Sequence, residues 1–347
     1  MDHLPTELLE AIFTLCCNDG GRTGSSLALV SKYVRAASRT SRFYSVALRS
    51  GSASQLHRLL SLLTAERAID SPLKPRVRHL YIASPKTHMD NFLYSYYRQG
   101  SQRPAEVEGL AEQYSQERLA FITNISLLLR MVAAEVETLC LAQSGDACRW
   151  TAEIPLYVPE AECGEFSALR ELTIVGGGMT FSNASTKGSI VYPRLSRLHL
   201  VGAATRLERW TARAPNISCL CVSDERGHMY QEVARVAHRD SEDTPVVFVG
   251  LKQFVIQPYG SALLQPGDPA ALPWDIQAPG FNEWQLGWLT RNAVQPFHLR
   301  PTKLVPGSEG SWEDITLREW LDRIDGGDGC WTMQIDVGQR SPSTSSV

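Results

Sequence analysis

The chain has 347 residues, of which 43% are hydrophobic and 20% are charged, and its formal net charge is -3. This composition is typical of a folded, water-soluble protein with ample material for a core. The near-neutral charge lacks the basic excess typical of nucleic-acid binding, so we expect no nucleic-acid partner. We expect no membrane partner either, because no run approaches the roughly 18 apolar residues that span a bilayer.

The cysteines indicate a reducing compartment. The eight are Cys16, Cys17, Cys140, Cys148, Cys163, Cys219, Cys221 and Cys330. No CxxC pair occurs, and most of these residues lie in apolar runs, where a thiol acts as a small hydrophobic side chain. Cys219 and Cys221 alternate along one strand with no histidine nearby in sequence, so we expect no metal and no cofactor. With no signal-peptide pattern at the N-terminus, we predict a cytoplasmic or nuclear protein.

The first 50 residues predict a small helical unit. A helix starts at Pro5, where a missing N–H has no cost, and runs to about Cys17. Its apolar residues fall in two rows, Leu8, Ile12, Leu15 and Leu9, Phe13, Cys16. A helix that is apolar on two faces must be covered on two sides. We predict a second helix from Ser25 or Ser26 and a third over residues 41–48, which makes a three-helix unit over residues 1–50.

A repeated apolar pattern predicts a series of strands behind this unit. The template apolar-x-x-apolar-x-apolar occurs at residues 77–82, 136–141, 169–174, 195–200, 217–222 and 251–256. Its last two positions alternate as in a strand. Segments with helical spacing lie at residues 54–68, 117–134, 204–213 and 228–238. We therefore predict parallel strands with outer helices over residues 51–260.

The last part of the chain changes character. Residues 261–338 are rich in proline and tryptophan, which we interpret as a C-terminal cap on the array. Within it we predict a helix at residues 312–324 and a strand at residues 331–337. Residues 339–347 are polar and serine-rich, and we expect them to be disordered.

One face of the predicted strands is a candidate binding surface. The residue between the last two apolar positions points away from the helices, toward the concave side of the arc. Candidate target contacts there are Tyr81, Thr173, His199 and Cys221. Solvated strand residues without a ligand are an equally good interpretation, because the set contains no acid–base pair or nucleophile arrangement.

Two known families resemble this chain. The first unit contains Leu4-Pro5-x-Glu7-Leu8-Leu9-x-x-Ile12 and Leu29-Val30-Ser31-Lys32. With these motifs, residues 4–48 resemble an F-box of the divergent fungal type. They depart from it in a longer loop at residues 18–24 and in Val34, where tryptophan is common. Residues 54–260 are similar to degenerate leucine-rich repeats without their regular asparagine. The fold class this implies is α/β, a three-helix F-box followed by an irregular leucine-rich-repeat-like solenoid.

The F-box resemblance implies a function and a contact set. F-box proteins bind the Skp-type adaptor, and through it a cullin, in SCF-type ubiquitin ligases. The adaptor contacts that the resemblance implies are Leu4, Pro5, Leu8, Ile12, Leu27, Val30 and Ser31. We therefore expect a non-enzymatic substrate-receptor subunit whose repeat arc binds an unknown target protein.

Two alternatives stay open. The helices could instead cap the first repeat of an interaction scaffold that acts outside any ligase. An enzyme using Asp275, Glu283 and His298 is the other alternative, although these residues form no recognisable motif.

Overall fold

The computed structural model describes the chain in thirteen segments. They are residues 4–49, 52–70, 74–84, 105–143, 157–159, 163–176, 178–180, 190–202, 207–225, 230–237, 248–258, 298–299 and 312–331. The helices are α1 (Thr6–Cys16), α2 (Arg22–Val30), α3 (Lys32–Ala37), α4 (Ala53–Ala68), α6 (Ala105–Val132), α8 (Leu207–Arg213), α9 (Tyr230–Ala237), α11 (Trp312–Ile324) and the 3-10 helix η3 (Gly329–Trp331). The strands are β1 (Ser45–Leu48), β2 (His79–Ala83), β3 (Thr138–Ala142), β4 (Tyr157–Pro159), β5 (Glu171–Val175), β6 (Gly178–Thr180), β7 (Arg197–Val201), β8 (Cys219–Glu225), β9 (Gln253–Pro258) and β10 (His298–Leu299).

A parallel sheet organises the fold. Eight strands follow one another in the order β1-β2-β3-β5-β7-β8-β9-β10, and β4 pairs with β6 in a small second sheet. Equivalent template positions pair across the main sheet, so that they form continuous rows. The first row is Leu80, Leu139, Leu172, Leu198, Leu220 and Phe254. All six strands predicted from the template are confirmed.

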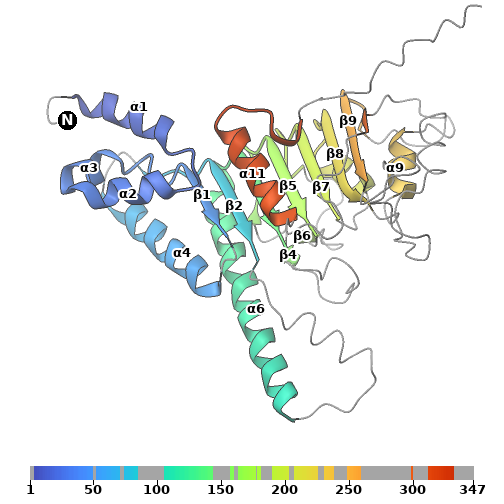
Figure 1. Ribbon diagram of the computed structural model, residues 1–347, viewed down its shortest axis with the longest axis horizontal. Helices are drawn as coiled ribbons and strands as arrows, with labels where there is room; N and C mark the ends of the chain where they lie inside the picture. The colour runs from blue at the N-terminus through green and yellow to red at the C-terminus, as the bar shows by residue number, and fades with distance from the viewer. Residues whose placement is uncertain are drawn as a thin grey trace, which may run out of the picture.

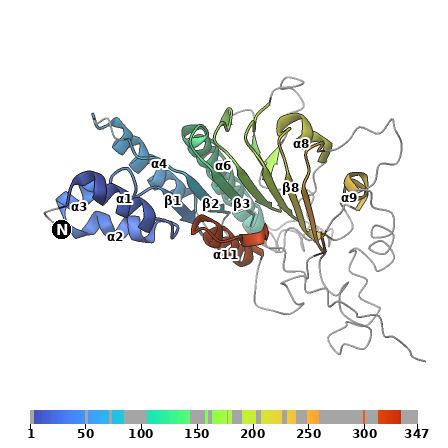
Figure 2. The same cartoon turned by 90° about the horizontal axis from the view of Figure 1, so that it is seen from above.

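Helices cover one face of this sheet. The row of leucines and the next apolar row pack against buried residues of α4, α6, α8 and α9, such as Leu56, Phe121 and Trp210. Figure 2 shows α6 and α8 on this side of the sheet. The predicted return helices are therefore confirmed, and α6 begins about a dozen residues earlier than its apolar spacing indicates.

The opposite face of the sheet is covered by the C-terminal segment, although an open face was expected. Helix α11 lies across β2, β3 and β5, in red in Figure 1, and buries Trp320 and Ile315 against Tyr81 and Cys140. The hydroxyl of Tyr81 donates to the main-chain oxygen of Glu313 at 3.0 Å. The cap predicted from the C-terminal composition thus contributes α11 and η3, which lie on the face of the sheet and leave no open surface beneath them.

Residues 41–48 do not form the predicted third helix. They form turns and then β1, which pairs in parallel with β2 through Ser45↔His79 and Leu48↔Ile82. The reason is tertiary: the main-chain oxygen of Tyr44 accepts from the N–H groups of both Arg78 and His79 at 3.0 Å. The third helix of the N-terminal unit is instead α3, and the sheet begins inside the segment 1–50.

Several predictions fall outside the described residues. They concern residues 332–337 of the strand predicted over residues 331–337, the tail at 339–347, Asp275 and Glu283. The first residue of that predicted strand, Trp331, belongs to η3 instead. Of the helices that are described, none is both long and apolar enough to cross a bilayer.

Substitution of Leu198 tests how much the apolar row contributes to stability. It is fully buried at the centre of the sheet. We expect Leu198→Ala to lower the free energy of unfolding by about 2–5 kcal/mol, since it removes buried methyl groups and leaves a cavity. Urea unfolding measures this. The matched control is Leu119→Ala, because Leu119 is exposed on α6; it should shift stability by no more than about 0.5 kcal/mol. Equal effects of the two variants would contradict the proposed core.

His79 makes the stability pH-dependent. Trp320 donates from Nε1 to Thr138 Oγ1 at 3.1 Å, and Nδ1 of His79 is hydrogen-bonded to the same oxygen at 3.0 Å. Burial, reinforced by the charges of Arg78 and Arg323, lowers the pKa of His79 from 6.5 to about 4.

The unfolded chain therefore binds more protons than the folded one between pH 6.5 and 4. We expect His79 to contribute about 3 kcal/mol to the free energy of unfolding above pH 6.5, and this contribution to be lost as the pH falls toward 4. Urea unfolding across this range should show a shallower pH dependence for His79→Gln than for the wild type. His57→Gln, on the exposed face of α4, should follow the wild type. Parallel curves for all three proteins would rule out this role of His79.

Candidate functional site: an apolar surface on the N-terminal helices

The three N-terminal helices, which we call the head, bury a small core of their own. Leu9 and Phe13 of α1 pack against Val34 and Ala37 of α3, with Leu27 of α2 partly buried beside them. This cluster is separate from the main core of the sheet. Leu9 and Phe13 of the second predicted row are thereby covered within the head, whereas Cys16 of the same row is exposed and Cys17 is buried.

The other apolar row of α1 is not covered by any of the residues that the structure describes. Leu8, Ile12 and Leu15 lie on α1 and Leu4 lies just before it at the same spacing; all four are exposed, Leu8 by 53% and Leu15 by 76%. We call these four residues the α1 stripe. Four large exposed aliphatic side chains in one row form a patch of the kind that marks an interaction site.

A second exposed apolar segment lies where α2 meets α3. Leu29 is 81% exposed, and Val30 and Tyr33 are also exposed. We call these three residues the α2–α3 junction. Ser31 separates the helices: its backbone is extended (φ -161°, ψ 167°), and its hydroxyl oxygen accepts from the N–H of Val34 at 3.1 Å. This N-cap ends α2 and starts α3, so the apolar residues on either side are presented at a corner.

The loop between α1 and α2 fastens the head to the sheet. Gly20 adopts φ 75°; its N–H donates to Ser45 Oγ at 3.0 Å, and its oxygen accepts from the N–H of Ala47 at 3.0 Å. Ser45 Oγ also donates to the main-chain oxygen of Cys17. The loop at residues 18–24, which the sequence comparison with the F-box pattern marked as long, thus contacts β1 through these hydrogen bonds.

Ion pairs hold the head against α4. Arg39 Nε lies 3.1 Å from Glu66 Oε2, and Arg42 also pairs with Glu66. Together with β1, these contacts hold the head at one end of the sheet, opposite the end where β9 and the edge strand β10 lie (Figure 1). The exposed apolar residues are thus carried on a fixed support.

The residues implied by the F-box resemblance divide into two groups. Six of them are exposed: Leu4, Pro5, Leu8, Ile12, Val30 and Ser31. Leu27 faces the core of the head, and the side chain of Ser31 caps α3. Leu15, Leu29 and Tyr33 are exposed apolar residues that the implied set omits. The helical spacing of Leu15 after Leu8 and Ile12 was the available signal.

The predicted target contacts are not available in this arrangement. Tyr81, Thr173, His199 and Cys221 occupy one row of the sheet as expected, but all four are buried, and α11 and η3 lie over this face. The expectation of an open binding face was wrong because the C-terminal segment fills it.

Burial and mutual hydrogen bonding perturb the thiols below this cover. The hydrogen bond from Cys330 lowers the pKa of Cys221, and the nearby His199 lowers it further. Burial raises the pKa of Cys330.

Chemically, the α1 stripe and the α2–α3 junction consist of aliphatic side chains and one tyrosine. They offer apolar area to a partner and no metal ligands. Comparison of the chain with protein-family models, with curated proteins and with solved structures found no match.

Gly24 tests how the head is built. It is buried in α2 against the backbone of Arg42, and a Cβ there would overlap the carbonyl oxygen of Arg42. We expect Gly24→Ala to lower the free energy of unfolding by about 1–3 kcal/mol, because α2 must move away. Amide hydrogen exchange should become faster in α2.

The control is Gly109→Ala in α6, where a Cβ meets no atom within 4 Å. Alanine should stabilise that helix by about 0.5–1 kcal/mol. A stable Gly24→Ala variant with unchanged exchange in α2 would refute the close packing of α2 on Arg42.

Proposed function

We propose that this chain is a substrate-receptor subunit of an SCF-type ubiquitin ligase. The α1 stripe and the α2–α3 junction would bind the Skp-type adaptor, and through it a cullin. The chain itself would perform no chemistry. It would bring a target protein close to the ubiquitin-transferring machinery and so raise the local concentration of the reacting groups.

The exposure of the α1 stripe is the observation that supports this proposal most directly. A helix that only stabilised its own head would need the covered row, Leu9 and Phe13, and would carry polar residues elsewhere. Instead, Leu8 and Ile12 are about half exposed. Burying an aliphatic side chain of this size contributes about 1.5–3 kcal/mol, so four on one face supply a substantial part of a stable interface.

The alternative, a scaffold in which the head caps the array, has one observation in its favour. Strand β1 joins the head to the edge of the sheet next to β2. However, the cover of the main core at that end comes from Phe43, Val46 and the helix α4. The residues of the α1 stripe do not belong to that core, so capping does not account for them.

The target surface is a separate question. Because α11 and η3 cover the row of Tyr81 and His199, we assign no target contact to this face. Among the described residues, other exposed apolar side chains lie on α6, such as Leu119 and Leu127.

Binding of a Skp-type adaptor tests the proposal. The full chain should bind the purified adaptor in isothermal titration calorimetry. We expect Leu8→Ala combined with Ile12→Ala to weaken binding about 100-fold, since each lost anchor of about 1.4 kcal/mol costs a factor of ten. Because both residues are exposed, thermal unfolding should change little.

The matched control combines Leu119→Ala with Leu127→Ala, two exposed leucines on α6. This variant should bind the adaptor like the wild type. If the wild type does not bind, the ligase function is wrong. If it binds and the Leu8/Ile12 variant binds equally well, only the assigned contacts are wrong.

A further inference from the structure

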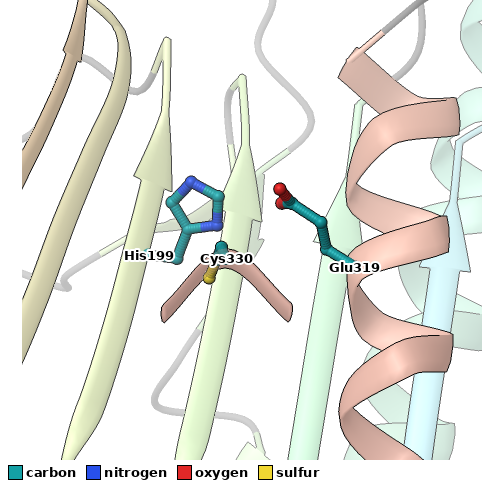
Figure 3. Close-up of side chains that lie close together, drawn as sticks. All are labelled: His199, Glu319 and Cys330. Atoms are coloured by element: carbon teal, nitrogen blue, oxygen red, sulfur yellow. The ribbon is translucent and has the colours of Figure 1, made fainter. Parts of the chain in front are cut away.

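A buried group of potential metal ligands joins the C-terminal cover to the sheet. His199 lies on β7, Glu319 on α11 and Cys330 on η3, and one ligand atom of each lies within 4.8 Å of the other two. Figure 3 shows the imidazole of His199 and the carboxylate of Glu319 extending toward each other, with Cys330 between them. All three residues are buried.

Cys221 lies next to this group without belonging to it. It is the register partner of His199 on the neighbouring strand β8. It belongs to the same buried cluster as Cys330, and the two thiols are hydrogen-bonded. One sulfur, one imidazole and one carboxylate suit Zn²⁺, which binds three protein ligands and a water molecule in its open four-coordinate sites.

The histidine is oriented as a ligand should be. Nε2 of His199 lies 2.9 Å from Ser223 Oγ, and Ser223 Oγ donates to Gln257 Oε1 at 3.0 Å. With the hydroxyl proton directed to Gln257, Nε2 of His199 donates and Nδ1 carries the lone pair. Metal-bound histidines have such a second partner, which fixes the tautomer and the ring orientation.

The cavity volume and the backbone conformation are also compatible with a bound metal ion. A small cavity of about 10 Å³ is lined by His199, Glu319 and Cys330, and also by Arg323. Its volume matches one water-sized occupant. Gly329 places Cys330 at the site: it adopts φ 57°, and its N–H donates to Asp322 Oδ2 at 2.8 Å. A Cβ on Gly329 would collide with the oxygen of Glu319.

We propose that His199, Glu319 and Cys330 bind one Zn²⁺ ion that clamps the C-terminal segment onto the sheet, with a water molecule as the fourth ligand. Binding releases the thiol proton of Cys330, so that one thiolate, one carboxylate and a neutral imidazole surround the ion. The thiolate and the carboxylate balance the charge of the ion, and Arg323 lines the same cavity. The expectation of no metal rested on the sequence around Cys219 and Cys221; the fold instead places His199 beside Cys330.

Metal titration of the full chain tests this site. We expect the reduced, metal-free protein to bind one Zn²⁺ per chain in equilibrium dialysis. Co²⁺ should give the absorption bands of a tetrahedral thiolate complex, and Zn²⁺ should abolish them. Cys330→Ser should lose this binding, and Ser223→Ala should weaken it about 10–100-fold. The control Cys163→Ser, a buried cysteine in the core on the other face, should bind like the wild type.

X-ray absorption on the zinc-loaded wild type keeps the test independent of variant folding. One sulfur ligand at about 2.3 Å and three nitrogen or oxygen ligands at about 2.0–2.2 Å are expected. A wild-type protein that folds but binds no Zn²⁺, a coordination shell without sulfur, or unchanged binding by Cys330→Ser would each overturn the proposal.

Discussion

The in-register pairing of parallel strands is the constraint on which the rest of this structure depends. Each strand places one row of side chains against α4, α6 and α8 and the alternate row against α11 and η3. Parallel sheets are normally covered on both faces, and here β2 is buried at every one of its five residues. The two faces differ in chemistry: the core on the helix side consists of aliphatic and aromatic side chains, whereas the other side also holds His199, Cys221 and Glu171.

The head is attached to the edge of the sheet, but its apolar core is separate from that of the sheet. Strand β1 extends the ladder by one strand, and Gly20 and Ser45 bind the preceding loop to it. The small core around Phe13 stays separate from the main one. The outward row of α1 is consequently exposed, while the polar cluster beneath α11 is buried. Docking and metal binding, as we propose them, therefore occupy different parts of the fold.

Local patterns predicted the elements that depend on short-range periodicity. The six strand templates appear as β2, β3, β5, β7, β8 and β9, and the helix at residues 312–324 has the bounds of α11. The helix predicted at residues 41–48 was wrong because these residues form a strand through pairing with β2, more than thirty residues away. The prediction of an open sheet face was wrong for the same reason, because its cover comes from a distant part of the chain. Tyr81 meets Glu313 only after more than two hundred residues of chain have been placed.

The candidate site was predictable to a similar degree. Leu8 and Ile12 are exposed on the helix that the Leu-Pro start predicts. Whether the apolar row of Leu9 or that of Leu8 would face outward was not evident, because that depends on where α3 packs. The most direct test of the central claim is amide hydrogen exchange of the full chain, free and with a Skp-type adaptor. We predict slower exchange on binding in α1 and around residues 29–33, with the sheet unchanged. No protection in the head, or protection confined to another part of the chain, would contradict it.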